Sequence, residues 1–314
     1  MTDITGRKIY TVTLNPALDL LTEAENVSLG AVNRLHSRAL VAGGKGINVS
    51  LILKELGIPS TALGFIAGSI GEAVVSELEE KGLGTDFIRL ESGFTRINIK
   101  VNAQEETELN CDGPFVSEKA REEFFEKLNH LPHDSFVVLA GSMPPGLSGD
   151  FYSQCAEILS SRGISFAADI TGRALAEILK YRPYVIKPNI FELEDMTGRK
   201  ADSREKLCRE TSMLISEGAE NVIVSLGADG CMFMNGLRKE KYYPAFKVDT
   251  VNTTACGDSM LAGFIAGKYM EMDEEKAMTL AVSCAAATAF SSGTGKKDEI
   301  KRIFSELTGG NDLL

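Results

Sequence analysis

A run of small residues ends in an aspartate late in the chain, in Ala255-Cys256-Gly257-Asp258. A helical pattern follows, and we expect that helix to begin near Asp258. The first turn of a helix has free backbone N–H groups and positive partial charge, so it can stabilise a phosphoryl group in transfer. Asp258 would then lie close enough to take a proton from an attacking hydroxyl. Because Asp is also a favoured N-cap, a purely structural role stays open at this point.

A glycine-rich segment, Gly43-Gly44-Lys45-Gly46, precedes an apolar helical pattern with Asn48 in its first turn. The glycines let the backbone approach a ligand closely, and Lys45 and Asn48 add a charge and an amide. The segment does not match the Walker A motif. It predicts a ligand-binding turn or a plain connection between a strand and a helix.

The segment from Asn15 to Asp19 directly follows the first predicted strand. Ligands of open α/β sheets bind at the carboxyl ends of the strands, and a carboxylate such as Asp19 can accept hydrogen bonds from sugar hydroxyls. Asn-Pro is equally typical of a turn. Arg96, in a later pair of predicted strands, is a candidate phosphate ligand or a solvated arginine.

Lys187 and Asn189 follow another buried strand, and Glu192 comes three residues after Asn189. At a helix start, Asn189 and Glu192 would face the same way, and their oxygens could hold Mg²⁺ or its waters. The same spacing is that of a capping box, and both interpretations can hold together. After the next strand, the segment from Ser225 to Gly230 is either a β-turn or a nucleotide-binding turn.

Short apolar runs that alternate with helical patterns indicate βαβ units and a parallel sheet covered on both faces. The predicted strands are 9–14, 62–66, 135–140, 165–169, 185–187 and 222–225. The clearest predicted helices are 46–56, 71–81, 117–129, 149–161, 203–218 and 258–269. Residues 95–110 predict two strands with one wet face, a candidate lid over a pocket, whereas 18–40 has no clean helix.

The composition excludes several classes of protein. The net charge is −11, and no basic stretch indicates a nucleic-acid partner. The six cysteines form no C-x-x-C pair and the three histidines are poor material for a metal site. No signal-peptide-like segment and no run of about 18 apolar residues occurs, so we expect a cytoplasmic protein that does not span a membrane.

Along the chain the motifs follow one another as Asn-Pro-Ala-Leu-Asp, Gly-Gly-Lys-Gly-Ile-Asn, Lys-Pro-Asn-x-x-Glu, Ser-x-Gly-x-x-Gly and Gly-Asp. In that order they resemble the PfkB family of carbohydrate kinases, from about Ile9 to Gly295. The chain is most similar to the branch that contains 1-phosphofructokinase and tagatose-6-phosphate kinase. The segments that favour the former are Thr13 to Asp19, Gly43 to Ser50, Thr95 to Asn98 with Lys100, and Thr107 to Asn110.

The resemblance implies a ribokinase-like fold, a three-layer α/β/α sandwich with a small β-sheet lid. It implies one kinase domain over residues 1–314, with lid segments at about 18–40 and 95–112. It further implies ATP and Mg²⁺ as cofactors and a homodimer formed through the lid. The implied reaction converts fructose 1-phosphate to fructose 1,6-bisphosphate, with tagatose 6-phosphate as the alternative substrate.

The resemblance also assigns roles to individual residues. Asp258 would be the catalytic base, with Gly257, Cys256 and Ala255 at the anion hole. The sugar phosphate would be held by Asp19, Gly43, Gly44, Lys45, Asn48, Arg96 and Ser142. The nucleotide would be held by Lys187, Asn189, Ser225, Gly227 and Gly230, with Glu192 and Asn189 organising Mg²⁺ through water.

One departure from the family concerns the anion hole. The usual Gly-Ala-Gly-Asp is Ala255-Cys256-Gly257-Asp258 here. If residue 255 needs a positive φ, the alanine costs stability or geometry. A sugar-phosphate sensor with weak or no catalysis is therefore a further alternative.

Overall fold

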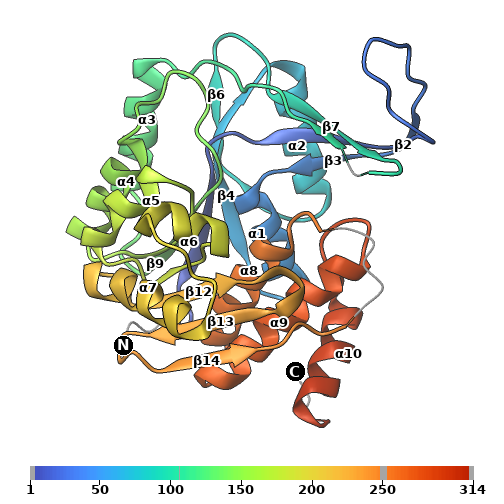
Figure 1. The fold of residues 1–314 in the computed structure, drawn as a ribbon. Coiled ribbons are helices and arrows are strands. Elements are labelled where there is room, and N and C mark those ends of the chain that lie inside the picture. The colour runs from blue at the N-terminus through green and yellow to red at the C-terminus, as the bar shows by residue number, and fades with distance from the viewer. Residues whose placement is uncertain (1–3, 106, 248–252, 311–314) are drawn as a thin grey trace.

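A mixed β-sheet forms the centre of the computed structural model, which describes residues 4–105, 107–247 and 253–310 (Figure 1). Its strand order is β14-β13-β12-β11-β10-β9-β1-β4-β5, with β6 paired to β4. The parallel strands are β1 (Lys8–Thr13), β4 (Ser60–Ala67), β5 (Gly84–Thr85), β6 (Ile88–Leu90), β9 (Ser135–Ala140), β10 (Ser165–Asp169), β11 (Val185–Ile186) and β12 (Asn221–Ser225). Two antiparallel strands, β13 (Cys231–Asn235) and β14 (Glu240–Tyr243), complete one edge.

Helices cover both faces of this sheet. One layer consists of α1 (Lys45–Glu55), α8 (Cys256–Tyr269), α9 (Glu274–Phe290) and α10 (Lys297–Thr308). The other consists of α3 (Glu118–Asn129), α4 (Phe151–Ser161), α5 (Arg173–Ile178), α6 (Ile190–Thr197) and α7 (Arg204–Glu217). Successive residues of β9 enter opposite layers, with Phe136 in the first core and Val137 in the second. Because both faces are buried, both alternating sets are apolar, which explains the continuous apolar runs of the sequence.

A second, smaller sheet has the order β3-β2-β7-β8 and projects from one end of the α/β body (Figure 1). Its strands are β2 (Ala17–Glu23), β3 (His36–Gly43), β7 (Arg96–Asn102) and β8 (Thr107–Leu109). Helix α2 (Gly68–Glu80) packs between this sheet and β4, where Leu18, Val74 and Ile66 share one core. The short connection from β1 to β2 brings the small sheet to the carboxyl ends of the central strands.

The predicted elements are all present, and most boundaries agree within a few residues. The two strands expected at 95–110 are β7 and β8. The stretch 18–40 contains most of β2 and part of β3, which its residue pattern did not indicate, although the family resemblance assigned this stretch to a β-sheet lid. Helix α8 begins at Cys256 rather than at Asp258. None of the helices in the described ranges is long and apolar enough to cross a bilayer.

Candidate active site

A cavity of about 540 Å³ lies between the carboxyl ends of the central strands and the small sheet. Thirteen of the residues predicted to carry the chemistry line it. They are Asp19, Gly44, Lys45, Asn48, Arg96, Ser142, Lys187, Asn189, Glu192, Ser225, Ala255, Gly257 and Asp258. Segments far apart in the sequence therefore converge on one site.

Asp258 lies in the first turn of α8 and is only 5% exposed. The N-cap of α8 is Ala255, so the alternative interpretation of Asp258 as the N-cap is wrong. The Ala255 backbone has a φ of 65°, which is the positive value considered from the sequence. Asn48 Nδ2 donates a hydrogen bond to Asp258 Oδ2 at 2.8 Å, which fixes the carboxylate at the free N–H end of the helix.

A second buried carboxylate, Asp169, lies at the end of β10 and was not predicted. It is 1% exposed, and its oxygens lie 3.0 Å from Lys45 Nζ and 3.4 Å from Lys187 Nζ. Buried charges are tolerated where they are paired in this way. Asp169 thus fixes two lysines, Lys45 from the glycine-rich turn and Lys187 from the segment after β11.

The two carboxylates have opposite pKa shifts. Burial, followed by the charge of Asp169, raises the pKa of Asp258 to about 7. Burial opposes ionisation of Asp169 too, but the ammonium groups of Lys187 and Lys45 outweigh it and lower the pKa of Asp169. A pair of groups whose environments separate their pKa values in this way is typical of acid–base chemistry. Asp258 is therefore poised to exchange a proton near neutral pH.

The small sheet brings a different set of groups to the opposite wall. Asn98 Nδ2 donates to Asp19 Oδ1 at 2.9 Å, and Lys100 Nζ lies 3.1 Å from Asp19 Oδ2. A Cβ atom at Gly43 would lie 2.5 Å from Asp19 Oδ2, so this position needs glycine for close approach. The half-buried Arg96 donates to the carbonyls of Asn15 and Cys111, and it forms no ion pair within the described residues. Arg96 is therefore a cation available to an anionic ligand.

The third wall contains the groups predicted for nucleotide and metal. Asn189 and Glu192 form a capping box at the start of α6, with both reciprocal hydrogen bonds at 2.8 Å. This confirms the structural interpretation of their spacing, and both residues line the cavity as well. No cluster of three or more potential metal ligands of the His, Cys, Asp or Glu type occurs in the part of the chain that is described.

Four predicted site residues do not line the cavity: Gly43, Cys256, Gly227 and Gly230. Gly227 and Gly230 shape the turn after β12, where the Leu226 N–H donates to the Gly230 carbonyl at 2.8 Å. Burial, and then the charge of Asp258, raises the pKa of Cys256 to about 11. This thiol stays protonated at neutral pH and is a poor nucleophile.

The sequence missed several residues of the site besides Asp169. Lys100, Glu108, Asn110 and Thr254 line the cavity. The first three stand in the segments that resemble the family, and Thr254 directly precedes the run of small residues that ends in Asp258. For Asp169 the available signal was its position, because an acidic residue ends a buried strand at the edge where ligands bind.

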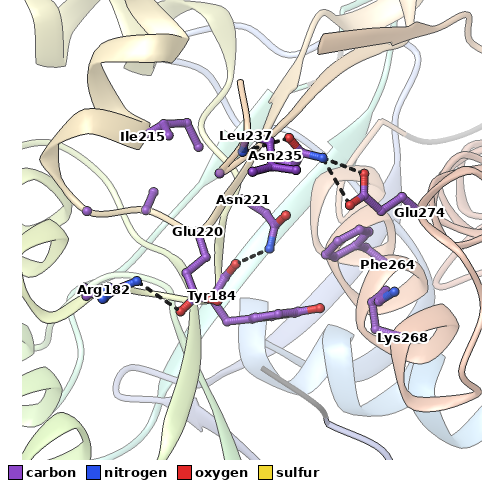
Figure 2. A pocket seen from close by; sticks show the side chains of 13 residues that line it. Arg182, Tyr184, Ile215, Glu220, Asn221, Asn235, Leu237, Phe264, Lys268 and Glu274 are labelled. Carbon is purple, nitrogen blue, oxygen red and sulfur yellow. Dashed lines mark hydrogen bonds and ion pairs between the residues drawn. The ribbon is translucent and has the colours of Figure 1, made fainter. Parts of the chain in front are cut away.

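A second hollow, of about 770 Å³, lies at the opposite end of the central strands (Figure 2). Its polar groups largely bond to one another. Asn235 Nδ2 donates to both oxygens of Glu274, and Asn221 Nδ2 donates to the Tyr184 carbonyl at 2.8 Å. Glu274, at the start of α9, is already held by Asn235, and none of the predicted site residues lines this hollow, so the smaller cavity is the candidate active site.

Comparison with known proteins identifies a family. Residues 12–301 match the pfkB family carbohydrate kinase model. A 1-phosphofructokinase from Bacillus subtilis is 38% identical over 95% of this chain and 98% of its own length. A D-tagatose-1-phosphate kinase from Bacillus licheniformis is 35% identical over 95% and 98% of the two chains.

Solved structures agree with the fold. A putative phosphofructokinase from Staphylococcus aureus has a TM-score of 0.83 at 35% identity, covering 95% of this chain and 96% of the other. An Arabidopsis thaliana ribokinase solved with ribose and ATP has a TM-score of 0.77 at 17% identity, covering 95% and 98%. The predicted ribokinase-like α/β/α sandwich is thereby confirmed.

Proposed function

This chain belongs to the pfkB family of carbohydrate kinases, and we propose that it phosphorylates fructose 1-phosphate with ATP to give fructose 1,6-bisphosphate. The observation that carries this proposal is the buried Asp258 at the N-terminal end of α8, with its pKa raised to about 7. A base with that pKa can take the proton of a sugar hydroxyl at neutral pH. The adjacent free N–H groups can stabilise the phosphoryl group in transfer.

The wall formed by the small sheet supports a phosphorylated sugar as the acceptor. In this proposal Arg96, which has no carboxylate partner among the described residues, binds the phosphate already present. Asp19 accepts hydrogen bonds from the sugar hydroxyls, and Asn48 holds Asp258 toward the acceptor. Gly43, Gly44, Lys45 and Ser142 complete this half of the site, and the small sheet acts as a lid that excludes water.

The opposite wall supports ATP as the donor. We assign Lys187 to the phosphates of ATP, because its side chain is buried beside Gly257, where an added Cβ would lie 2.8 Å from Lys187 Nζ. Asn189, Ser225, Gly227 and Gly230 complete the nucleotide side. Glu192 has one oxygen engaged in the capping box, which fits Mg²⁺ held mainly through water. When bound, Mg²⁺ would neutralise charge on the transferred phosphates.

Two observations favour second candidates. A relative that acts as a D-tagatose-1-phosphate kinase makes that sugar phosphate a candidate, beside the tagatose 6-phosphate expected from the sequence. The positive φ of Ala255 at the anion hole keeps a weakly catalytic sensor as the other alternative. A sensor would bind a sugar phosphate with little or no ADP release, whereas a tagatose-phosphate kinase would release ADP.

The deciding experiment measures ADP release with Mg-ATP against four acceptors: fructose 1-phosphate, D-tagatose 1-phosphate, tagatose 6-phosphate and fructose 6-phosphate. We expect the highest kcat/KM with fructose 1-phosphate. A higher value with either tagatose phosphate would keep the mechanism and change the substrate. Binding of a sugar phosphate without ADP release would establish the sensor.

The proposal includes a cytoplasmic homodimer formed through the small sheet. Leu40 on β3 is 53% exposed and Leu109 on β8 is 54% exposed, so each edge strand of the small sheet has an apolar side chain that a partner subunit would cover. The six cysteines are all free thiols, which supports a reducing compartment.

A further inference from the structure

A chain of polar contacts crosses the active-site cavity from the small sheet to the start of α8. It begins at Asp19 on β2, passes through Lys100 on β7 and Glu108 on β8, and ends at Thr254. All four residues line the cavity. Thr254 directly precedes Ala255, the N-cap of α8, so the chain connects the sugar side of the site with the anion hole.

Each link of this chain is a polar contact. Lys100 Nζ lies 3.1 Å from Asp19 Oδ2 and 3.8 Å from Glu108 Oε1. Thr254 Oγ1 donates a hydrogen bond to the same oxygen, Glu108 Oε1, at 3.3 Å. The side chain of Lys100 is 18% exposed and that of Glu108 is 36% exposed, so the contacts run from the interior to the rim of the cavity.

Glu108 has a special place in this chain because it reaches both sides. Its carboxylate belongs to the small sheet and accepts two hydrogen bonds, one from the nearby Asn110 Nδ2 at 3.3 Å and one from Thr254, which lies before α8 and 146 residues later in the sequence. β8 pairs only with β7 among the described strands and has three residues, so it is held weakly by its own sheet. The hydrogen bond from Thr254 to Glu108 therefore stabilises β8, which its own sheet holds on one side.

We propose that Glu108 is a positioning residue that holds the small sheet to the segment Thr254–Asp258 at the start of α8 through its hydrogen bond with Thr254. We call this contact the clasp. The clasp keeps Lys100 beside Asp19 and holds Ala255 in place under the bound sugar phosphate. This inference rests on the proposed kinase function, because it assigns the clasp to closure of the same site. Since the Thr254–Glu108 hydrogen bond lies at the rim and is neutral on the donor side, it can open for substrate entry and product release.

The test compares Thr254→Val, which removes the hydroxyl at nearly constant shape, with Thr254→Ser, which keeps it. Glu108→Ala and the double variant with Thr254→Val complete a cycle, and Thr279→Val, a hydroxyl deletion on the remote α9, is the matched control. Kinetics with fructose 1-phosphate and ADP release without any sugar phosphate are measured for each.

We expect Thr254→Val and Glu108→Ala each to raise KM for fructose 1-phosphate about fivefold with kcat changed less than about twofold. Their ADP release without sugar phosphate should rise relative to kcat, because an open lid admits water. The double variant should resemble Glu108→Ala, because that substitution already removes the contact with Thr254, together with the Glu108 contacts to Lys100 and Asn110. Thr254→Ser and Thr279→Val should behave as the unmodified protein.

Hydrogen exchange of the β8 amides gives a readout that needs no activity. Faster exchange in Thr254→Val but not in Thr254→Ser would support the clasp even if fructose 1-phosphate were not a substrate, so the two proposals can fail separately. Additive kinetic effects in the double variant, or identical exchange in the Val and Ser variants, would overturn the clasp.

Discussion

Asp258 and Asp169 form a pair of buried carboxylates whose charges interact. With the pKa of Asp258 at about 7, the fraction of enzyme with an ionised base rises with pH up to that value. We therefore predict that kcat/KM for the sugar phosphate falls about tenfold per pH unit below pH 7 and levels off above it. A pH–rate profile measured at fixed ionic strength checks this.

Substitution of Asp169 should move that profile. Asp169→Asn removes a negative charge that raises the pKa of Asp258 and leaves the Lys45 and Lys187 charges less balanced. Both effects favour the ionised form of Asp258, so the acid limb of the kcat/KM profile should shift to lower pH by about one unit. We also expect a lower kcat, because Lys45 and Lys187 lose the carboxylate that holds them. Asp202→Asn, on an exposed pair with Lys206, is the control and should leave the limb in place. An unshifted limb in Asp169→Asn would refute the coupling.

Ala255 has the backbone conformation that glycine adopts most readily. Its φ of 65° is in the left-handed region, where a Cβ atom is strained. We predict that Ala255→Gly stabilises the protein by about 1 kcal/mol, because the relief of strain exceeds the added entropy of the unfolded chain. Thermal unfolding should show a rise of about 2 °C. Ala262→Gly, at a buried position inside α8, should lower the unfolding temperature instead.

Individual residues of the site differ in how far their sequence predicted them. Asp258, Asn48 and Arg96 stand in segments with a chemical pattern or a family resemblance, and the cavity contains all three. Asp169 ends an apolar strand with no motif around it, so only the three-dimensional arrangement shows its two lysine partners. Cys256 was predicted to lie at the anion hole because its neighbours in the sequence match the family motif, but its side chain does not line the cavity.

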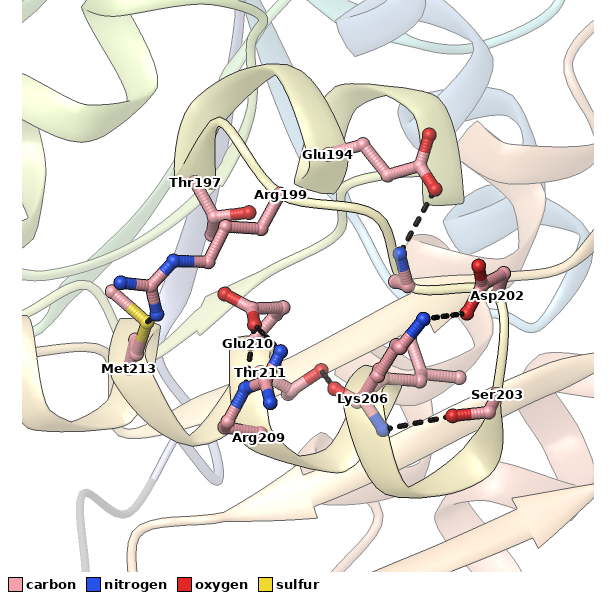
Figure 3. Close-up of polar contacts among 12 residues, drawn as sticks. Glu194, Thr197, Arg199, Asp202, Ser203, Lys206, Arg209, Glu210, Thr211 and Met213 are labelled. Atoms are coloured by element: carbon pink, nitrogen blue, oxygen red, sulfur yellow. Dashed lines mark hydrogen bonds and ion pairs between the residues drawn. The ribbon is translucent and has the colours of Figure 1, made fainter.

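Helix α7 contains a buried charge that has no role in the site (Figure 3). Glu210 lies in the core-facing stripe between Leu207 and Leu214 and is 0% exposed. Its Oε1 atom accepts a hydrogen bond from Arg209 Nε at 2.8 Å, whereas Oε2 has no hydrogen-bond partner among the described residues. The stripe therefore includes one costly carboxylate, and Arg209 is the cation that pairs with it among the described residues.

The two members of this pair should respond differently to substitution. Glu210→Met replaces the carboxylate by an apolar side chain of similar size and leaves the half-exposed Arg209 to water, so stability should stay the same or rise by about 1 kcal/mol. Arg209→Ala leaves Glu210 buried without a partner and should destabilise the protein by about 3 kcal/mol. Urea unfolding of both variants measures this difference, and equal effects would contradict it.

The elements of the central sheet were predictable because their apolar runs are continuous and bounded by turns. Helix α9 is buried on nearly all sides and lacks a clear apolar stripe, and the sequence did not indicate it. Helix α8 is buried in the same way but was predicted, because a run of small residues leads directly into its helical pattern. Strands β13 and β14 were also not predicted, because a hairpin at the edge interrupts the βα alternation that guided the assignment. In β2 and β3, partial exposure dilutes the apolar pattern.

We propose that two molecules pair through the small sheet, where Leu40 on β3 and Leu109 on β8 are exposed. Leu40→Lys on β3 should convert the dimer to a monomer, because it places a charge in a surface that the partner would bury. Leu237→Lys, at a 70% exposed position by the second hollow, is the control and should leave the assembly unchanged. Sedimentation velocity distinguishes the two, and a monomeric unmodified protein would contradict the interface.

The account of the whole molecule depends on phosphoryl transfer to a sugar phosphate with Asp258 as the base. The measurement to make is ADP release with Mg-ATP and fructose 1-phosphate for the unmodified protein and Asp258→Asn, with fructose 1-phosphate binding measured on both by calorimetry. We predict turnover in the unmodified protein, a loss of about 10³-fold or more in kcat in the variant, and similar binding in both. A variant whose kcat stays within tenfold of the unmodified value would contradict the assignment of Asp258.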